Sequence, residues 1–290
     1  MAVSNLAARV LFAVVAIPVV VAIIWAGGFA LAALLAVAGA LAAAEYFQLA
    51  RAGSYEPMEV VGVPLAFVLP IGVFGYQIGH FTPPVLTLGA VIIAAVFALA
   101  IFARGPGGHP MGAAAVTVFG ILYGAGFLSF AFGLRYHNYA VGRAAGSALL
   151  FYPLVLTWIS DTAGFFVGRS MGRHKLIPSV SPGKTVEGAI GGLATSMLIA
   201  WLYTRFVLHP ATSLDFRWRP GGVLLFGALI SIAAQIGDLA ESLLKREAGM
   251  KDSSALIPGT GGVLDRIDSL LFVMPVAYVV LGWLLTWAPT

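Results

Sequence analysis

Charge is scarce in this sequence, since Asp, Glu, Lys and Arg together make up 10% of its 290 residues. A water-soluble domain typically carries about a quarter charged residues. Here 60% of the residues are hydrophobic, and the mean hydropathy is +0.97. The chain is therefore expected to be an integral membrane protein and not a soluble globule.

Cysteine is absent altogether, which excludes disulfides, thiolate metal ligands and cysteine nucleophiles. A Walker A loop is also missing. Gly183-Lys184-Thr185 has the ending of that motif, but the pattern requires glycine at position 178, where the chain has Pro178. No internal repeat is visible, and the short connections between apolar runs leave no room for a separate soluble domain. Thiol chemistry and a P-loop are therefore excluded as the basis of function.

Several apolar runs reach the roughly 20 residues that a helix needs to cross a bilayer. Their Ala, Gly, Leu and Val content argues against the alternating pattern of a membrane barrel. We therefore predict an all-α, polytopic membrane helical bundle with about nine transmembrane helices. The first run exceeds the roughly 7–15 apolar residues of a signal peptide and is expected to be retained. The expected spans are 8–26, 28–50, 60–77, 84–103, 112–133, 146–168, 187–208, 221–243 and 267–287.

The placement of basic residues predicts the orientation, because cytoplasmic loops carry an excess of Lys and Arg. With a cytoplasmic N-terminus, eleven of the 16 basic residues lie on the cytoplasmic side. We therefore expect a cytoplasmic N-terminus, an external C-terminus and a multi-pass protein of the cell (inner) membrane. The net charge of +4 is attributed to this topology and not to nucleic-acid binding. All four lysines fall in two cytoplasmic loops, 169–186 and 244–266, which are expected to face each other at a cytoplasmic active site.

The two halves of the chain differ in character. Up to about residue 145 there are three acidic residues and no lysine, so residues 1–145 are expected to form a transmembrane scaffold. Residues 146–290 would form the catalytic region, with one continuous membrane domain as the alternative. Glu45 lies near the end of its span beside Arg51, which favours an interfacial role over a functional intramembrane carboxylate.

Charge is concentrated between Gln235 and Asp268, a stretch that holds six of the 12 acidic residues and four of the 16 basic residues. Asp238 shares a helical face with polar neighbours three or four positions away. Asp265 and Asp268, at i and i+3, begin the last span, where the helix dipole favours anions. A basic group lies between these two elements and suits phosphates: Lys245, Arg246 and Lys251.

Three aspartates on two helices predict a metal site. Neighbouring carboxylates repel each other unless a cation lies between them, and no sulfur or imidazole accompanies Asp238, Asp265 and Asp268. Oxygen ligands of this kind suit Mg²⁺ or Mn²⁺ and not zinc. A structural network of these aspartates with Arg246 and Arg266 is the alternative.

A second polar segment begins at Asp161, inside an apolar span. A carboxylate there costs about 2.5–3.5 kcal/mol on insertion scales and usually faces a cavity or a partner. The alternative is an aspartate satisfied by Ser160, Thr157 or an arginine one turn away. Small residues recur every four positions and predict a close helix contact: Gly164, Gly168 and Gly172.

The segment continues into a predicted phosphate-binding turn. Ser181, Pro182 and Gly183 indicate a turn with free N–H groups and hydroxyls, and Lys184 adds a positive charge beside it. Thr185 is suited to cap the helix that follows, with Glu187 in its first turn. A capped loop with an incidental lysine is the alternative.

These two segments carry a family resemblance. The run S-L-L-K-R-E-A-G-M-K-D-S-S-A-L-I-P-G-T-G-G-V-L-D-R-I-D, Ser242 to Asp268, resembles the signature of the phosphatidate cytidylyltransferases, also called CDP-diacylglycerol synthases. Asp161 to Gly188, with its two Gly-Arg pairs and S-P-G-K-T-V-E-G, resembles that family's second conserved region. The first 150 residues resemble the family in being membrane spans. The family usually has histidine where this chain has Thr260, so we assign that residue no catalytic role.

The resemblance implies a nucleotidyltransferase of phospholipid biosynthesis. A phosphate oxygen of phosphatidate would attack the α-phosphorus of CTP, giving CDP-diacylglycerol and pyrophosphate. Mg²⁺ is the implied cofactor, and a second divalent or a monovalent cation and a homodimer are left open. The expected partners are CTP, phosphatidate and membrane lipids.

Residue roles follow from the resemblance by position. The implied catalytic residues are Asp238, Lys251, Asp265 and Asp268. The implied metal ligands are Asp161, Asp238, Asp265 and Asp268. The implied substrate-binding residues are Arg169, Arg173, Ser181, Lys184, Thr185, Lys245, Arg246 and Arg266.

Two other functions stay open. One is a CTP-dependent polyprenol kinase, or a cytidylyltransferase that acts on an isoprenoid lipid. The other is a transporter in which Asp161 and Asp238 bind a coupling ion. The absence of an inverted repeat and the clustering of charge on one membrane face argue against the transporter.

Overall fold

The computed structural model describes residues 2–80, 85–138, 142–212, 216–257 and 261–287. Within these ranges the chain is mostly helical, with two short two-stranded sheets. Eight helical segments are long and apolar enough to cross a membrane, and they overlap the second to ninth predicted spans. The first predicted span lies in helix α1 (Ala2–Ala26), whose described apolar part is Val14–Ala26. The predicted all-α membrane bundle is thus confirmed, while its orientation stays a prediction.

The chain forms two compact units, each made of two separate stretches of sequence. Unit 1 consists of residues 1–129 and 244–267, and unit 2 of residues 130–243 and 268–290. Residues 244–267 therefore pack with the N-terminal helices, far from them in sequence. The division near residue 145, expected from charge and function, stays a prediction. The compact units group the chain differently.

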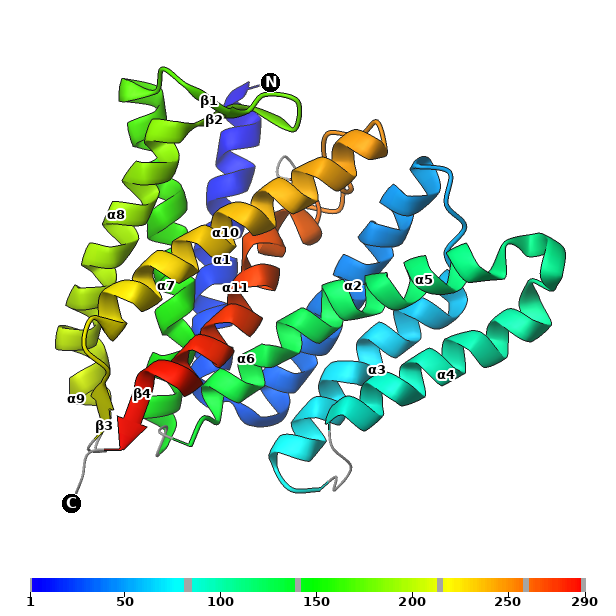
Figure 1. Ribbon diagram of the computed structural model, residues 1–290, viewed down its shortest axis with the longest axis horizontal. Helices are drawn as coiled ribbons and strands as arrows, with labels where there is room; N and C mark the ends of the chain where they lie inside the picture. The colour runs from blue at the N-terminus through cyan, green and yellow to red at the C-terminus, as the bar shows by residue number, and fades with distance from the viewer. Residues whose placement is uncertain (1, 81–84, 139–141, 213–215, 258–260, 288–290) are drawn as a thin grey trace. The chain divides into compact units, whose positions relative to one another are not determined.

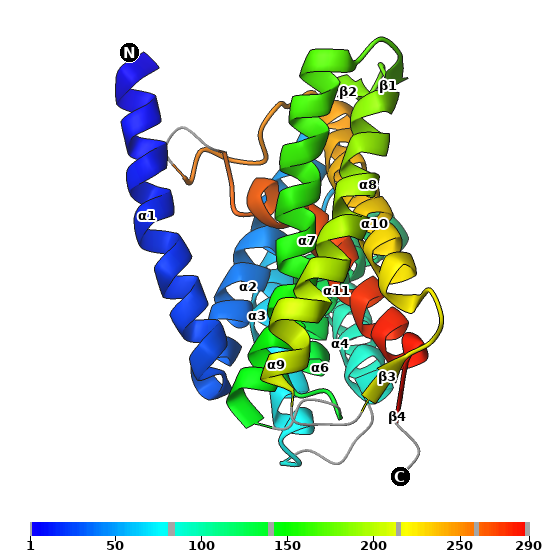
Figure 2. The same ribbon diagram turned by 90° about the vertical axis from the view of Figure 1, so that its left-hand side faces the viewer.

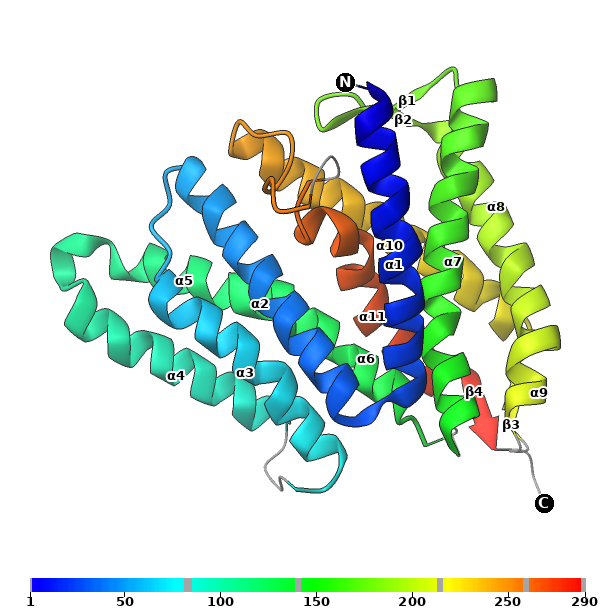
Figure 3. The ribbon, with the colours of Figure 1, turned by 180° about the vertical axis from the view of Figure 1, so that it is seen from behind.

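Unit 1 is built around helix α2, whose small residues let the neighbouring backbone approach closely. A Cβ atom on Gly39 would lie 2.9 Å from Ala125 Cα, and one on Gly124 would lie 2.9 Å from Ala43 N. Figure 3 shows α2 beside α3 and α5, with α4 along the edge of this group. The elements are α2 (Gly28–Ala52), α3 (Glu59–Gln77), α4 (Val85–Ala103), η1 (Pro106–Gly108), α5 (Pro110–Ile121), the π-helical segment η2 (Leu122–Gly126) and the start of α6 (Phe127–Arg135).

Unit 2 holds the end of α6 and the remaining helices and strands. Helices α7 and α8 lie side by side, and the hairpin of β1 and β2 joins them at one end (Figures 1 and 2). The elements are α7 (Gly142–Met171), β1 (Lys175–Ile177), β2 (Ser181–Thr185), α8 (Val186–Tyr203), the π-helical segment η3 (Thr204–Leu208), α9 (His209–Ala211), β3 (Phe216–Trp218), α10 (Gly222–Glu247, as far as residue 243), α11 (Leu264–Leu284, from residue 268) and β4 (Leu285–Trp287).

Aromatic packing fixes the core of unit 2 at the end away from the hairpin. The rings of Tyr152 and Tyr203 stack with centroids 4.7 Å apart and an interplanar angle of 7°. Their hydroxyls are satisfied inside the bundle, because Tyr152 Oη donates to Ala200 O at 2.9 Å and Tyr203 Oη donates to Ala148 O at 2.8 Å. These bonds hold α7 against α8 and so help to position the polar groups at the other end of this helix pair, near the hairpin.

Candidate active site

A polar cluster in unit 2, called here the Asp238 cluster, joins the two charged sequence segments. It consists of Asp161 on α7, Lys184 on β2, and Asp238 and Ser242 on α10. Lys184 Nζ lies 2.7 Å from Asp238 Oδ2, and Ser242 Oγ donates to Asp238 Oδ1 at 3.3 Å. Asp238 and Lys184 are also close enough to Asp161 for their charges to act on it. Residues more than 50 positions apart in sequence thus share one charged site.

Asp161 does not form the hydrogen bonds with Thr157 or Ser160 that one interpretation of the sequence expected. Thr157 Oγ1 donates to Pro153 O at 2.8 Å, and Ser160 Oγ lies 2.7 Å from Ser231 Oγ. Asp161 itself is exposed and accepts no hydrogen bond within the ranges that the structure describes. Its position beside Lys184 and Asp238 supports the interpretation of an intramembrane carboxylate that faces a partner.

The predicted close contact at the glycines of α7 is confirmed, and its partners are the end of β2 and the first turn of α8. A Cβ atom on Gly168 would lie 2.9 Å from Thr185 Oγ1, and one on Gly188 would lie 2.7 Å from Gly164 O. Both distances are too short for any larger side chain, so α7 and α8 approach at backbone distance. This contact sets the end of β2, and therefore Lys184, above the first turn of α8.

The hairpin itself corrects one prediction. The turn expected at Ser181–Gly183 is wrong: residues 178–180 form the turn, and Ser181–Thr185 is the extended strand β2, which pairs antiparallel with β1. Pro178 has a restricted φ and no N–H to donate, which suits a turn better than a strand. Lys184 therefore projects from a short sheet and not from a phosphate-type loop.

Side chains at both ends of this hairpin hold it on α8. Thr185 Oγ1 accepts a hydrogen bond from Gly188 N at 3.1 Å, so the predicted helix cap is confirmed. Glu187 Oε2 accepts from Arg173 N at 3.0 Å, and Glu187 Oε1 lies 2.6 Å from His174 Nδ1. The side chains of Arg169 and Arg173 are exposed at this end of α7. The proposed phosphate contacts of Ser181, Thr185 and these arginines stay predictions.

Helices α10 and α11 meet at a glycine beside Asp238. A Cβ atom on Gly237 would lie 2.7 Å from Asp268 O and 2.9 Å from Ser269 Cα. Only glycine permits this approach, which brings the backbone of Asp268 against the turn of α10 that carries Asp238. The sequence expectation that these two aspartates lie together on neighbouring helices is therefore supported at the level of the backbone.

In unit 1, Asp265 is held by four hydrogen bonds. Its Oδ1 accepts from Lys245 Nζ at 2.7 Å, and its side chain is 7% exposed. Its Oδ2 accepts from Ser253 Oγ at 2.7 Å, Gly262 N at 2.7 Å and Ser253 N at 2.9 Å. Asp265 therefore ties the end of α10 to the loop before α11.

Glu45 corrects a second prediction. The interfacial role beside Arg51 is wrong, because Glu45 is 3% exposed and Arg51 pairs with Glu59. Four donor atoms from residues more than 200 positions away lie within hydrogen-bond distance of the Glu45 carboxylate: Ser254 Oγ at 2.7 Å, Leu264 N at 2.7 Å, Ser253 Oγ at 3.0 Å and Val263 N at 3.0 Å. We call these five residues the Glu45 cluster.

The Glu45 cluster holds the charged loop and the start of α11 in place by hydrogen bonds. Two of its donors are backbone N–H groups at the start of α11, where a carboxylate is favoured by the helix dipole. Ser253 Oγ lies within hydrogen-bond distance of both Glu45 and Asp265, so one buried serine links the two carboxylates. The first half of the chain thus contributes directly to the position of a candidate site residue.

The remaining basic candidates lie on exposed positions. Arg246, Lys251 and Arg266 are exposed. Lys245, by contrast, is directed to Asp265. Thr260, with Pro258 and Gly259, lies outside the described residues. Whether loops 169–186 and 244–266 face each other stays a prediction, since they belong mainly to different units.

The carboxylates differ in how well they fit a metal ion. No three His, Asp or Glu side chains within the described ranges form a ready-made metal site. Asp161 and Asp238 fit a hard cation, because they are two oxygen donors in one charged cluster and Asp161 has no hydrogen-bond donor there. Asp265 does not fit in this arrangement, since both its oxygens accept bonds from the protein. Metal ligation by Asp265 stays a prediction that would require Lys245 to move.

Comparison with known proteins identifies the family of the chain. A sequence model described as the cytidylyltransferase family matches residues 7–284. The chain belongs to the cytidylyltransferase family. This match covers the helices of both units, including the first 150 residues, where the sequence motifs alone showed nothing but membrane spans.

Three similar proteins are named phosphatidate cytidylyltransferase. The one from Haemophilus influenzae is 46% identical over 142 residues, 49% of this chain and 48% of the relative. The one from Staphylococcus haemolyticus is 40% identical over 149 residues, 51% and 55% of the two chains. The one from Bacillus subtilis is 41% identical over 137 residues, 47% and 48%. The chain thus spans about half the length of the curated relatives it matches.

Sequence reasoning missed the Glu45 cluster and the role of Gly237. Glu45 carried a weak signal, a carboxylate within an apolar span, but its partners Ser253 and Ser254 lie in a loop whose position no local pattern predicts. Gly237 directly precedes Asp238 in a helix, where glycine is unfavourable by about 1 kcal/mol. A glycine at that place indicates a close backbone contact.

Proposed function

We propose that this chain transfers the cytidylyl group of CTP to phosphatidate, giving CDP-diacylglycerol and pyrophosphate. Membership of the cytidylyltransferase family and the name shared by the three relatives support the reaction type. The observation that carries the proposal is the ion pair between Lys184 and Asp238. It brings together one residue from each of the two charged sequence segments within unit 2.

The chemistry requires two polyanions to meet. An ionised phosphate oxygen of phosphatidate attacks the α-phosphorus of CTP, the bond to the bridging oxygen breaks, and pyrophosphate leaves. Because the nucleophile is already an anion at neutral pH, no strong general base is needed. Positioning and charge neutralisation supply the catalysis.

Each unit supplies positive charge for these polyanions. Lys184 is held by Asp238 and remains 25% exposed, so a triphosphate can reach its ammonium group. Arg169 and Arg173 flank the same end of α7. In unit 1, Lys245 is oriented by Asp265, and exposed basic side chains follow it along the chain: Arg246, Lys251 and Arg266. These groups are proposed to bind CTP, phosphatidate and the departing pyrophosphate.

Mg²⁺ is the proposed cofactor, with a second divalent or a monovalent cation left open. Asp161 and Asp238 would hold it, with Asp268 and Asp265 as further candidate ligands. When bound, such an ion neutralises the triphosphate and polarises the α-phosphoryl group. Asp238 would then exchange its contact with Lys184 for the ion, which leaves the ammonium group available to phosphate.

The proposed location is the cell (inner) membrane, with the site on the cytoplasmic side. The eight apolar helices and the bacterial relatives support a multi-pass protein of that membrane. The cytoplasmic side is proposed because CTP is a cytoplasmic nucleotide and the basic loops follow the positive-inside rule. A homodimer is compatible with this proposal but not required by it.

Pyrophosphate release from CTP, measured with and without phosphatidate and Mg²⁺, tests the function directly. We expect release that requires both, and its loss in Asp238→Asn with the fold retained. CTP labelled at the α-phosphorus separates the alternatives, because a cytidylyltransferase places the label in the lipid and a polyprenol kinase leaves it in CDP. Replacing phosphatidate by a polyprenyl phosphate tests the isoprenoid acceptor. No phosphatidate-dependent release would refute the proposal.

A further inference from the structure

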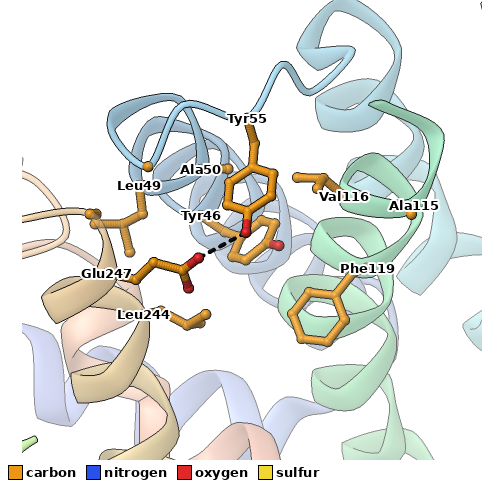
Figure 4. A pocket seen from close by; sticks show the side chains of 11 residues that line it. Tyr46, Leu49, Ala50, Tyr55, Ala115, Val116, Phe119, Leu244 and Glu247 are labelled. Atoms are coloured by element: carbon orange, nitrogen blue, oxygen red, sulfur yellow. Dashed lines mark hydrogen bonds between the residues drawn. The ribbon is translucent and has the colours of Figure 1, made fainter. Parts of the chain in front are cut away.

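A cavity of about 340 Å³ opens in unit 1, and no residue of the Asp238 cluster or the Glu45 cluster lines it. It lies between the C-terminal part of α2, the second half of α5 and the end of α10 that belongs to unit 1. Figure 4 shows Tyr46, Tyr55, Phe119 and Glu247 around this opening. Its volume is within the range of small-molecule sites, about 300–1,000 Å³.

Aromatic rings form much of the wall. Tyr46 is 8% exposed and lies at the base, with its ring centroid 5.3 Å from that of Phe119. Phe119 and Tyr55 are 48% and 46% exposed, so their rings can reach a bound molecule. The face of an aromatic ring carries partial negative charge and attracts a cation within about 6 Å of its centroid.

Glu247 adds a full negative charge to the same wall. Tyr55 Oη donates to Glu247 Oε1 at 2.8 Å, and this bond, with the charge of the carboxylate, raises the pKa of Tyr55. Glu56, Glu59 and Asp265 of unit 1 each pair with a basic side chain. No basic side chain within the described ranges pairs with Glu247, so its charge is available to a ligand.

We propose that this cavity binds an organic ammonium ion between the Glu247 carboxylate and the rings of Tyr46, Tyr55 and Phe119. A metal ion fits less well, because Mg²⁺ or Ca²⁺ requires about six oxygen ligands and most of the wall is carbon. The cation–π attraction of several rings and the nearby carboxylate together match an amine that carries methyl or methylene groups.

Two sources supply this chemistry: a free amine, or the ammonium headgroup of a zwitterionic phospholipid. The cavity lies near the ends of two membrane spans, because its lining includes the last turns of α2, which ends at Ala52, and of α10, which ends at Glu247. Phospholipid headgroups and interfacial aromatic residues occur at this depth. The site does not depend on the proposed reaction with CTP, so the two proposals fail independently.

Binding is tested with the full-length protein in a maltoside detergent, with tetramethylammonium chloride as the probe. Saturation-transfer NMR on the probe's methyl protons gives the dissociation constant, with NaCl keeping the ionic strength constant. We expect saturable binding that weakens about tenfold in Glu247→Gln and about threefold in Phe119→Ala. Asp252→Asn is the matched control, since it removes an exposed carboxylate that does not line the cavity, and it should bind as the wild type does.

Phe119 is half exposed, so its substitution should leave the fold intact and keeps the test valid if Glu247→Gln unfolds. Absence of saturation in the wild type, or equal affinity in wild type, Glu247→Gln and Phe119→Ala, would overturn the proposal.

A second arm separates the two sources. Native mass spectrometry compares retention of phosphatidylethanolamine and phosphatidylglycerol with the same acyl chains. Preferential retention of phosphatidylethanolamine that Glu247→Gln abolishes supports a lipid ligand. Tetramethylammonium binding without that preference supports a free amine, whereas binding of neither probe refutes the site.

Discussion

Replacing Glu45 by alanine should destabilise unit 1 by several kcal/mol, although Glu45 lies outside both charged sequence segments. Four donors lie within hydrogen-bond distance of the carboxylate, on Ser253, Ser254, Val263 and Leu264, and the hydroxyl of Ser253 is shared with Asp265. Alanine would leave these donors without their acceptor and would also open space beside α2. The effect should be largest for the donors that water cannot reach.

The magnitude follows from the burial of each donor. Leu264 is buried, and a buried N–H without an acceptor costs about 1–3 kcal/mol. Val263 N loses a contact equivalent to a helix N-cap, about 1 kcal/mol. Ser253 retains its bond to Asp265, and Ser254 is partly exposed, so each adds about 0.5 kcal/mol. Removal of a buried charge offsets part of this cost, and we expect a net loss of about 2–4 kcal/mol.

Circular dichroism during unfolding in mixed micelles measures this loss. Glu59→Ala is the control, because Glu59 forms a partly exposed ion pair with Arg51, whose side chain is 54% exposed, and exposed pairs contribute at most about 1 kcal/mol. Glu45→Gln should be intermediate, since the amide keeps one acceptor oxygen and places an N–H₂ group against the other two donors. The reasoning fails if Glu45→Ala is no less stable than Glu59→Ala.

Three further changes test other parts of the structure. Gly188→Ala should destabilise the protein by about 1–3 kcal/mol and lower its activity, because the new Cβ would lie 2.7 Å from Gly164 O. Gly183→Ala is the control, since its Cβ would meet nothing within 4 Å, and it should match the wild type in thermal unfolding. Equal stability of the two variants would argue against the α7–α8 contact. Glu187→Gln should weaken the bond to His174 and speed hydrogen exchange in residues 173–185 while the helices stay protected; unchanged exchange would remove Glu187 from that role. In this cysteine-free chain, an impermeant maleimide should label Ser179→Cys in inside-out vesicles and Arg219→Cys in right-side-out vesicles, and the reverse result would invert the proposed topology.

The helices and the glycine contact could be predicted from the sequence because both depend on neighbours along the chain. Apolar runs predict spans whatever their partners are. The spacing of Gly164 and Gly168 predicts a close contact on one helical face, and the structure confirms it against Gly188 and Thr185. The cap of α8 by Thr185 is local in the same sense, since donor and acceptor are three residues apart.

The turn of the hairpin and the role of Glu45 were predicted wrongly, for different reasons. At Ser181–Gly183 several residue types favour a turn, but Pro178 precedes them and the strand pairing of β2 with β1 decides the outcome. Glu45 was judged by its distance from Arg51 along the helix. Its actual partners come from a loop about 210 residues later, and Arg51 finds Glu59 instead.

The sequence by itself determined that the chain is a bundle of membrane helices whose chemistry rests on aspartates and lysines, because hydropathy and composition act residue by residue. Only the tertiary structure decided how these groups are paired. Lys184 binds Asp238, Lys245 binds Asp265, and Ser253 links Asp265 to Glu45. The sequence does not show which of several lysines pairs with which aspartate, because any lysine can pair with any aspartate. Close backbone contacts at glycines such as Gly188 and Gly237 determine which side chains come within reach of one another.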